Sequence, residues 1–319
     1  MKILFLGEND YWRISSAQYY MRCALEKITD MVKYGPNFPS YMEHKGIVDV
    51  PTLEKIFEPD IILLQGFRSK EMLELDRWRN LKETSAPKAI FFSNPHTDPQ
   101  IRASKINQAE IGMSLQHVKG WIHKYKPLFA PSHKMRWVPF CINPDVFKDY
   151  GFDRIYDVAI LGAMNPEIYP LRFMVANSLI KRKDLKVFYR PRPRGGAVPD
   201  PNKAFMRANY AKAIARCKMM IFCTCKFKYP VQKFIETMGC KTLGLADIPL
   251  DAKELHFKPD YNFVELNNNN FINKIYYYLK HENERRKIIE NGYNTVMKYH
   301  TCEIRAKQIL HYLEELLEG

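Results

Sequence analysis

One segment of the sequence places a single carboxylate inside a predicted helix, with several basic side chains around it. Residues 228–247 read KYPVQKFIETMGCKTLGLAD, and an apolar run at 219–222 precedes them. Residues 231–238 have the spacing of an amphipathic helix and the apolar run at 242–246 follows, so the order strand, helix, strand is predicted. Glu236 lies within this helix, where its carboxylate can accept hydrogen bonds from both hydroxyls of a ribose while nearby lysines neutralise a diphosphate. This pattern is typical of a nucleotide-sugar pocket, and it is equally compatible with a surface helix between two buried strands.

The rest of the chain alternates short apolar runs with helix-like stretches. Runs that are apolar throughout indicate strands buried on both faces of a parallel sheet. Further strands are predicted at residues 2–7, 59–66, 88–92, 134–140, 157–162 and 185–189. Further helices are predicted at residues 15–31, 169–180, 204–217, 271–279, 282–299 and 303–317, with helical parts in 101–130. Strands that alternate with helices imply βαβ units.

A polar, turn-rich stretch at residues 143–156 lacks periodicity, and the strand-helix pattern restarts after it. The sequence therefore predicts an α/β protein with two Rossmann-like domains that face a cleft. Their limits are residues 1–145 and 146–302, and a C-terminal helix at 303–319 is expected to pack near the first domain. Because ligands of parallel sheets bind at the carboxyl ends of the strands, the loops after the strands would line this cleft.

Composition and charge restrict the class of protein. The 319 residues are 46% hydrophobic and 13% aromatic, which fits a globular chain rather than a disordered one. The formal net charge of +14 favours a polyanionic partner, such as nucleic acid, an anionic membrane surface or a phosphorylated substrate. Seven cysteines, an odd number mostly within apolar segments, indicate reduced thiols in a cytoplasmic protein. No signal peptide and no transmembrane segment are predicted.

Several segments resemble a known group of enzymes. They are WVPFCINPDVF at 137–147, DVAILGAMNPEIYPLR at 157–172, KFIETMGCKTLGLAD at 233–247 and the tail at 281–310. Together with the two successive α/β domains, they resemble glycosyltransferases of the GT-B fold, and among these the spore-maturation type found in bacteria and phages. The resemblance covers most of the second half well and the first half weakly.

The resemblance implies transfer of a sugar from a nucleotide diphosphate, expected to be UDP-linked, to an acceptor hydroxyl. The C-terminal domain would hold the donor, with Glu236 matching the acidic residue that grips the ribose and Gly162 letting the backbone approach. No metal or other cofactor is expected, because enzymes of this fold stabilise the leaving diphosphate with basic side chains and helix N-termini. The basic residues expected in donor binding are Arg190, Arg194, Lys228 and Lys233. As a departure, Lys241 stands where the family commonly has glycine.

Candidates for catalysis lie in the first domain, which would present the acceptor. His96 and Asp98 follow the strand at 88–92, and Asp10 follows the first strand. If the reaction inverts the anomeric centre, a base must take the acceptor proton, and Asp10 or Asp98 could do so. In a retaining enzyme His96 could instead bind hydroxyls of the donor sugar. Each of the three also suits a purely structural role in a turn.

The acceptor is left open between alternatives. The charge, the arginine-rich loop at 191–196 and the basic-aromatic mixtures at 121–126 and 226–229 suit a phosphate backbone, so one hypothesis is a hydroxymethylated base in DNA. A second hypothesis is the same chemistry on a protein, a lipid-linked sugar or a polysaccharide. A third is a non-catalytic nucleic-acid-binding protein on a GT-B scaffold.

Overall fold

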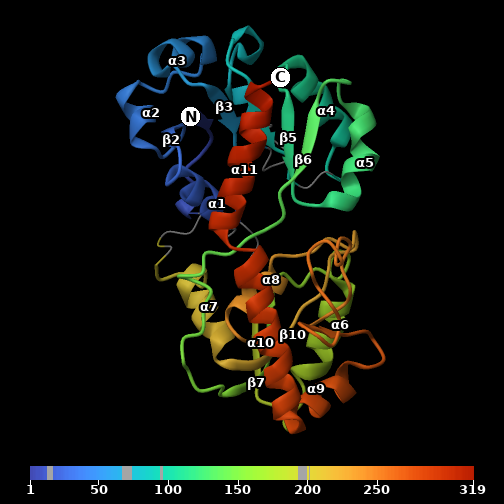
Figure 1. Cartoon of the computed structure of the whole chain (residues 1–319). Helices are drawn as coiled ribbons and strands as arrows, with labels where there is room; N and C mark the ends of the chain where they lie inside the picture. Colours follow the sequence, from blue (N-terminus) through green and yellow to red (C-terminus); the bar gives the residue numbers. More distant parts are fainter. Residues whose placement is uncertain (13–16, 67–73, 94–95, 193–199, 201) are drawn as a thin grey trace. The chain divides into compact units, whose positions relative to one another are not determined.

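The computed structural model describes residues 1–12, 17–66, 74–93, 96–192, 200 and 202–319, and its chain divides into two compact units (Figure 1). The first unit comprises Met1–Asp10, Met21–Pro139 and Arg305–Gly319, and the second comprises Tyr11–Tyr20 and Phe140–Ile304. Residues 11–20 thus group with the second unit, although the sequence places them in the first domain. The domain limits drawn from the sequence stay a prediction.

A six-stranded parallel sheet forms the centre of the first unit, in the order β2-β1-β3-β4-β5-β6. Its strands are β1 (Lys2–Leu6), β2 (Asp30–Tyr34), β3 (Ile61–Leu64), β4 (Lys88–Phe91), β5 (Met113–Gln116) and β6 (Lys134–Trp137). All residues of β3 and β4 are buried, which is why both read as apolar runs in the sequence. The sequence did not predict β2 or β5, because polar residues interrupt both, among them Lys33 in the edge strand β2 and Ser114 in β5.

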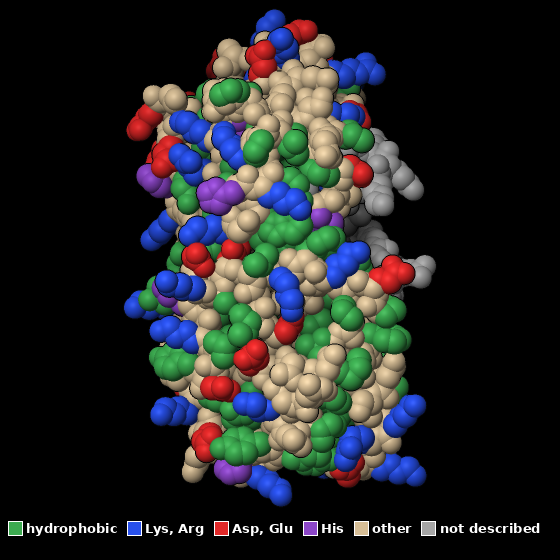
Figure 2. Space-filling model, turned by 90° about the vertical axis from the view of Figure 1, so that its right-hand side faces the viewer, with side chains coloured by type: hydrophobic (Ala, Val, Ile, Leu, Met, Phe, Trp, Pro, Cys, Tyr) green, Lys and Arg blue, Asp and Glu red, His purple; other side chains and the backbone are tan. Residues whose placement is uncertain are grey.

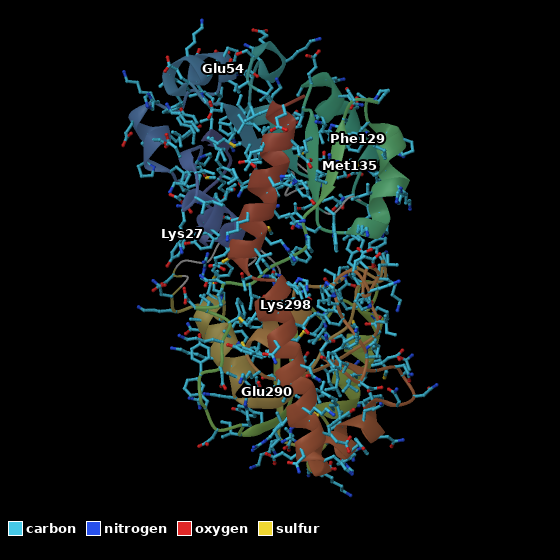
Figure 3. All side chains as sticks on the ribbon, viewed as in Figure 1. Lys27, Glu54, Phe129, Met135, Glu290 and Lys298 are labelled. Atoms are coloured by element: carbon cyan, nitrogen blue, oxygen red, sulfur yellow. The ribbon has the colours of Figure 1, made fainter. Side chains whose placement is uncertain are left out.

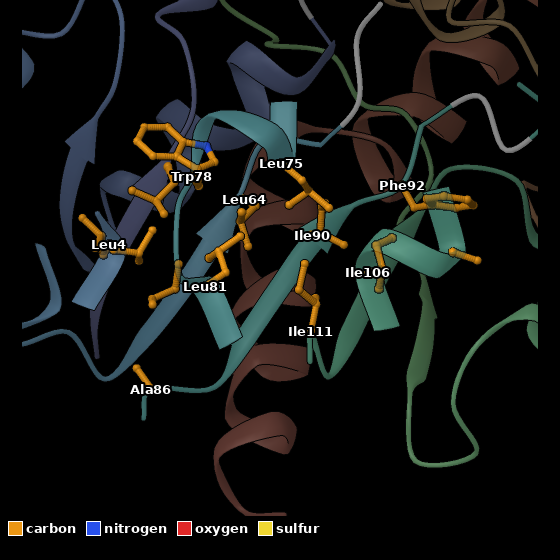
Figure 4. Close-up of a cluster of buried hydrophobic side chains, with 14 of the residues drawn as sticks. Leu4, Leu64, Leu75, Trp78, Leu81, Ala86, Ile90, Phe92, Ile106 and Ile111 are labelled. Atoms are coloured by element: carbon orange, nitrogen blue, oxygen red, sulfur yellow. The ribbon is translucent and has the colours of Figure 1, made fainter. Parts of the chain in front are cut away.

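Helices cover this sheet, and apolar side chains fill the space between the layers. The helices are α1 (Ala17–Glu26), α2 (Pro39–Glu43), α3 (Val50–Phe57), α4 (Pro99–Gln108) and α5 (Ile122–Tyr125). Short 3₁₀ helices are η1 (Asp10–Trp12), η2 (Glu74–Arg77), η3 (Leu81–Glu83), η4 (Lys119–Trp121) and η5 (Lys126–Leu128). Leu4, Leu64 and Ile90 from the sheet and Ile106 from α4 belong to one buried cluster, shown in Figure 4.

Two buried histidines of this unit make its stability dependent on pH. The Nδ1 atoms of His117 and His133 lie 2.7 Å from the carbonyl oxygens of Val138 and Ile111 respectively, so each Nδ1 must donate. Burial lowers the pKa of both side chains from 6.5 to about 4. Between these pH values the unfolded chain binds more protons than the folded chain does. The contribution of the neutral histidines to stability is therefore complete above pH 6.5 and is lost as the pH falls through 4.

We therefore expect the free energy of unfolding of the first unit to fall by about 3 kcal/mol per histidine between neutral pH and pH 4. In His117→Asn the amide can still donate to the Val138 carbonyl. This variant should take up one proton fewer on unfolding, so its stability should depend less steeply on pH. Urea denaturation at a series of pH values measures it, with the exposed His123→Asn as the control. An unchanged pH slope in His117→Asn would contradict the assignment.

The second unit contains a five-stranded parallel sheet in the order β11-β10-β9-β7-β8. Its strands are β7 (Tyr156–Gly162), β8 (Val187–Pro191), β9 (Cys217–Ile221), β10 (Leu243–Ala246) and β11 (Val264–Glu265). Its helices are α6 (Pro170–Leu179), α7 (Arg207–Ala215), α8 (Lys233–Gly239), α9 (Phe271–Lys280) and α10 (Glu282–Tyr299). With the first sheet, this confirms the predicted pair of parallel-sheet α/β domains.

The last helix, α11 (Cys302–Leu317), contacts the first unit over most of its length. Arg136 on β6 donates to the Glu315 carboxylate at 2.8 Å, and Lys134 donates to the Glu315 carbonyl oxygen at 2.9 Å. Gln308 donates to the carbonyl oxygen of Trp137 at 3.0 Å. These bonds join α11 to the edge strand β6, where the open backbone and side chains would otherwise face solvent.

None of the seven cysteines, all within the described residues, forms a disulfide bond, and six of them are buried. Within the part of the chain that the structure describes, we find no helix whose length and apolar content would let it span a bilayer.

Candidate active site

Three residues predicted from the sequence meet at the carboxyl end of the second sheet. Gly162 is the last residue of β7, and Lys233 is the first residue of α8, which follows β9 in the chain. Glu236 lies three residues further along α8, so it shares a helix face with Lys233. Because β7 and β9 are parallel neighbours, their ends meet at one edge of the sheet, and this brings the three residues together.

Gly162 makes room for the side chain of Lys233. Its φ is +107°, a backbone conformation that residues other than glycine rarely adopt. A Cβ atom at this position would lie 2.8 Å from Cε and 3.0 Å from Nζ of Lys233. The lysine therefore lies directly over the backbone at the end of β7, and any larger residue at position 162 would displace it.

Gly162→Ala should thus move Lys233 and weaken binding of an anionic ligand at this site, besides costing roughly 1–3 kcal/mol of stability through backbone strain. Gly151→Ala is the matched control, since Gly151 also has positive φ (+65°) but no atom within 4 Å of the added methyl group. Chemical denaturation should show a loss of similar size for both variants, whereas titration with UDP should show weaker binding for Gly162→Ala alone. Equal UDP affinity in the two variants would contradict this role for Gly162.

Glu236 is a buried carboxylate, with 7% of its surface exposed. Burial raises its pKa, while the neighbouring Lys233 and Arg192 charges oppose the rise. Burial and the Glu236 charge together raise the pKa of Tyr210 on α7 well above its usual value, so this phenol stays neutral. A hydrogen bond from the Tyr210 phenol also favours the ionised carboxylate. Glu236 forms no ion pair with any described residue, so its remaining acceptor positions can bind a ligand.

The ammonium group of Lys233 lies near other cations. Burial, followed by the charge of Arg172, lowers its pKa, and Glu236 partly opposes this effect. The ammonium also lies 5.7 Å from the ring centroid of Tyr210. A site with this surplus of positive charge attracts an anion, because a bound anion relieves the repulsion between Lys233 and Arg172.

Sequence reasoning did not identify Arg172, although it lies within the quoted segment 157–172. It is 2% exposed on α6, and its guanidinium donates to the carbonyl oxygens of Ala163 and Cys223, each at 3.1 Å. These bonds tie the loop after β7 to the end of β9. The guanidinium also lies 4.3 Å from the ring centroid of Tyr169, and its Nη1 would be 3.3 Å from a Cβ at position 162.

The remaining basic candidates have different surroundings. Arg190, at the end of β8, is exposed and lies 4.0 Å from the ring centroid of Phe205. Lys228 pairs with Asp247 at 2.8 Å and is mostly exposed, so its charge is already compensated. Arg194 lies outside the described residues. Arg192, which the sequence analysis did not select, donates its backbone N–H to the Gly162 carbonyl oxygen at 2.9 Å.

Lys241, the departure from the family pattern, lies just after α8 with φ +49°. A residue at this position after a helix must adopt a left-handed conformation, which explains the usual glycine. Its ammonium pairs with Glu290 on α10 at 2.9 Å; Glu290 is labelled in Figure 3. The lysine thus joins α8 to α10 through this ion pair.

The three candidates of the first unit do not share one environment. Asp10 is 1% exposed and pairs with Arg22 at 3.1 Å, and this guanidinium lies over the rings of Phe5 and Phe38. His96 is half-buried, with its ring 6.4 Å from that of Trp121. Asp98 is exposed at the start of α4 with φ +46°. In sheet order, β3 separates β1, which precedes Asp10, from β4, which precedes the other two.

No cluster of three or more metal-ligating side chains occurs among the described residues. The second unit thus has the geometry of an anion site, with Lys233 and the buried Arg172 beside the Gly162 backbone. The buried Glu236 carboxylate lies one helical turn along α8 from Lys233.

Comparisons with known proteins agree with this geometry. Residues 182–311 match the family described as glycosyl transferase-like. No curated protein matches the chain.

Solved structures resemble the chain over its whole length. Anabaena HepE in complex with UDP-glucose has a TM-score of 0.67 at 12% identity, covering 99% of this chain and 100% of its own. Sucrose-phosphate synthase from Thermosynechococcus elongatus has a TM-score of 0.68 at 11% identity, covering 100% and 99%. A glycosyltransferase from Rickettsia africae has a TM-score of 0.65 at 12% identity, also covering 100% and 99%. At such identities the likeness shows the fold, which is the GT-B fold expected from the sequence.

Proposed function

We propose that the chain is a glycosyltransferase, which transfers a sugar from a UDP-linked donor to an acceptor hydroxyl; the match of residues 182–311 to the glycosyl transferase-like family supports this. The observation that carries this proposal is the buried carboxylate of Glu236, one helical turn from Lys233 and without an ion pair to any described residue. A ribose offers two hydroxyl donors to such a carboxylate, and a diphosphate offers its charge to the lysine. That Anabaena HepE, which has the same fold, was solved with UDP-glucose supports the choice of donor.

In the proposed complex the diphosphate lies beside Lys233, whose side chain the missing Cβ of Gly162 allows to lie over the end of β7. Lys233 and Arg172 then stabilise the negative charge that develops on the diphosphate as the sugar leaves. Because these two cations converge on one point, the proposal assigns leaving-group stabilisation to side chains and includes no metal. Arg192, whose backbone is bonded to Gly162, borders the same site.

On the acceptor side we propose Asp98 as the base, because its carboxylate is exposed whereas that of Asp10 is buried against Arg22. His96, two residues before Asp98, would then contact the transferred sugar. The acceptor in this proposal is a hydroxymethylated base in DNA, as for some phage enzymes of the GT-B fold. The formal charge of +14 supports a phosphate-bearing acceptor over a neutral one.

A thermal-shift series with UDP-, GDP-, ADP- and CDP-linked sugars, in the presence of EDTA, tests the donor assignment. A ligand that binds the native state stabilises it, by about 2.7 kcal/mol at a hundredfold excess over Kd. This stabilisation raises the melting temperature. UDP-sugars alone should give the rise. A rise with another nucleotide would change the donor, and no rise with any would contradict the proposal. Incubation of the identified donor with hydroxymethylated DNA, and separately with polysaccharide and protein acceptors, then distinguishes the acceptors.

A further inference from the structure

The positive charge of the protein is concentrated in one segment of the second unit. Residues 181–218 contain twelve Lys and Arg residues but only two acidic ones, Asp184 and Asp200, so this segment alone supplies +10 of the net +14. The segment runs from the end of α6 through β8 and α7 into β9. On the face drawn in Figure 2, by contrast, basic and acidic side chains are interspersed.

The edge strand β8 carries one part of this charge on a single face. Among the strands that the structure describes, β8 pairs with β7 alone and so lies at the edge of the sheet. Side chains alternate along an extended chain, so Lys186, the residue before β8, shares a face with Phe188 and Arg190 of the strand, about 6.6 Å apart along the chain. The Phe188 ring contacts those of Tyr156 (centroids 4.9 Å apart) and Phe205 (6.2 Å), and Arg190 lies over Phe205. Exposed cations thus border a row of half-buried rings.

The end of α7 repeats this arrangement. Arg216, which follows α7, lies 4.7 Å from the ring centroid of Phe152, and Lys212 lies 5.9 Å from that of Tyr150. The two rings are stacked, with centroids 5.4 Å apart. The backbone N–H of Tyr156 donates to the Arg216 carbonyl oxygen at 3.1 Å, so this cluster adjoins the one on β8.

Most of this charge is not compensated. Lys186, Arg190, Lys212 and Arg216 form no ion pair with any residue that the structure describes. Lys218, in the same segment, instead pairs with Asp157 at 2.7 Å. Repulsion among these cations destabilises the free protein, and binding of an anionic chain relieves that repulsion.

We propose that this basic face, defined as Lys186, Arg190, Lys212 and Arg216 with the rings of Phe152, Phe188 and Phe205, binds the phosphate backbone of nucleic acid. An extended polyanion fits a row of cations that follows a strand and continues onto a helix end, and cations beside aromatic rings are typical of single-strand binding. An anionic bilayer would require apolar side chains that project beyond the cations, whereas these rings are half-buried beneath them. The inference deepens the proposed function by naming a surface for its acceptor.

The basic face also leads to the donor site. Arg192 follows β8 directly, and its backbone is bonded to Gly162 at 2.9 Å. A nucleic-acid strand that follows β8 from Lys186 to Arg190 would therefore approach Gly162 and Lys233. Binding at the face and turnover at the site are nevertheless separate events, and they can be measured separately.

Fluorescence anisotropy of labelled DNA, single-stranded and duplex, tests the proposal over about 50 to 200 mM salt. The test variant is Lys186→Gln/Lys212→Gln/Arg216→Gln, which leaves the residues near Gly162 in place. The control, Lys253→Gln/Lys280→Gln/Lys287→Gln, removes the same charge from other exposed positions of the second unit. We expect the test variant to bind at least tenfold more weakly, with a salt slope lower by roughly three units, and the control to retain most of its affinity.

Three outcomes would overturn the proposal: no salt-dependent DNA binding by the unaltered protein, equal losses in both triple variants, or binding to phosphatidylglycerol vesicles without binding to DNA. The thermal shift with UDP-glucose is measured on the same three proteins. A donor shift retained in a test variant that no longer binds DNA supports the assignment to this face. If the unaltered protein shows DNA binding but no donor shift, the donor assignment fails and the basic face stands.

Discussion

Replacing Glu236 by Gln is expected to weaken binding of UDP about a hundredfold while leaving the fold intact. A carboxylate can accept from both ribose hydroxyls with the strength of a charge-assisted bond, whereas an amide has one acceptor oxygen and no charge. A loss of roughly 2–3 kcal/mol corresponds to this factor. Isothermal titration with UDP measures it directly.

The same substitution should not destabilise the free protein. Burial raises the pKa of Glu236, which means that the ionised carboxylate is held there at a cost when no ligand is bound. Glutamine removes that cost, so the melting temperature without ligand should stay the same or rise, while the increase caused by UDP should vanish. This combination separates a binding residue from a structural one, since loss of a structural carboxylate would lower the melting temperature.

Glu290→Gln serves as the matched control. Glu290 lies on α10, is exposed, and pairs with Lys241, so its replacement removes a surface ion pair worth about 1 kcal/mol or less. It should leave UDP affinity unchanged. Unchanged UDP affinity in Glu236→Gln as well would show that the ribose is bound elsewhere.

The proximity of Gly162, Lys233 and Glu236 could be predicted from the sequence because two local rules apply to them. Apolar runs that end in glycine or a polar loop mark the carboxyl ends of parallel strands, and such ends meet at one edge of a sheet. A spacing of three within a helix then fixes the common face of Lys233 and Glu236. Both rules use residues close in sequence.

Arg172 and Tyr210 follow no such rule. They come from α6 and α7, and they meet the others only because those two helices pack at particular angles against the sheet. Likewise, the sequence shows which basic residues lie near a strand end, but it does not show which of them form ion pairs. Lys228 lies beside Asp247, nineteen positions away, whereas Lys233 has no such partner among the described residues. The strands β2 and β5 were not recognised because polar residues interrupt them.

Lys233 should determine how activity depends on alkaline pH. The lysine acts in its charged form, and burial together with the Arg172 charge lowers its pKa below the usual 10.5. Raising the pH therefore removes the active form earlier than for an ordinary lysine, and kcat/KM, which reports the free enzyme, should decline below pH 10.5.

Two substitutions separate charge from position. Lys233→Met keeps an aliphatic side chain of similar length without charge, and it should lower kcat by roughly 10²–10³, as removal of one transition-state contact does in other enzymes. Lys233→Arg stays charged throughout the accessible pH range, so its lower maximal activity should persist at pH values where the unaltered enzyme has declined. The measurement is the profile of kcat/KM against pH, with the exposed Lys253→Met as control. If Lys233→Arg showed the same alkaline decline as the unaltered enzyme, another group would be titrating, and the charge that assists departure of the diphosphate would have to come from Arg172 alone.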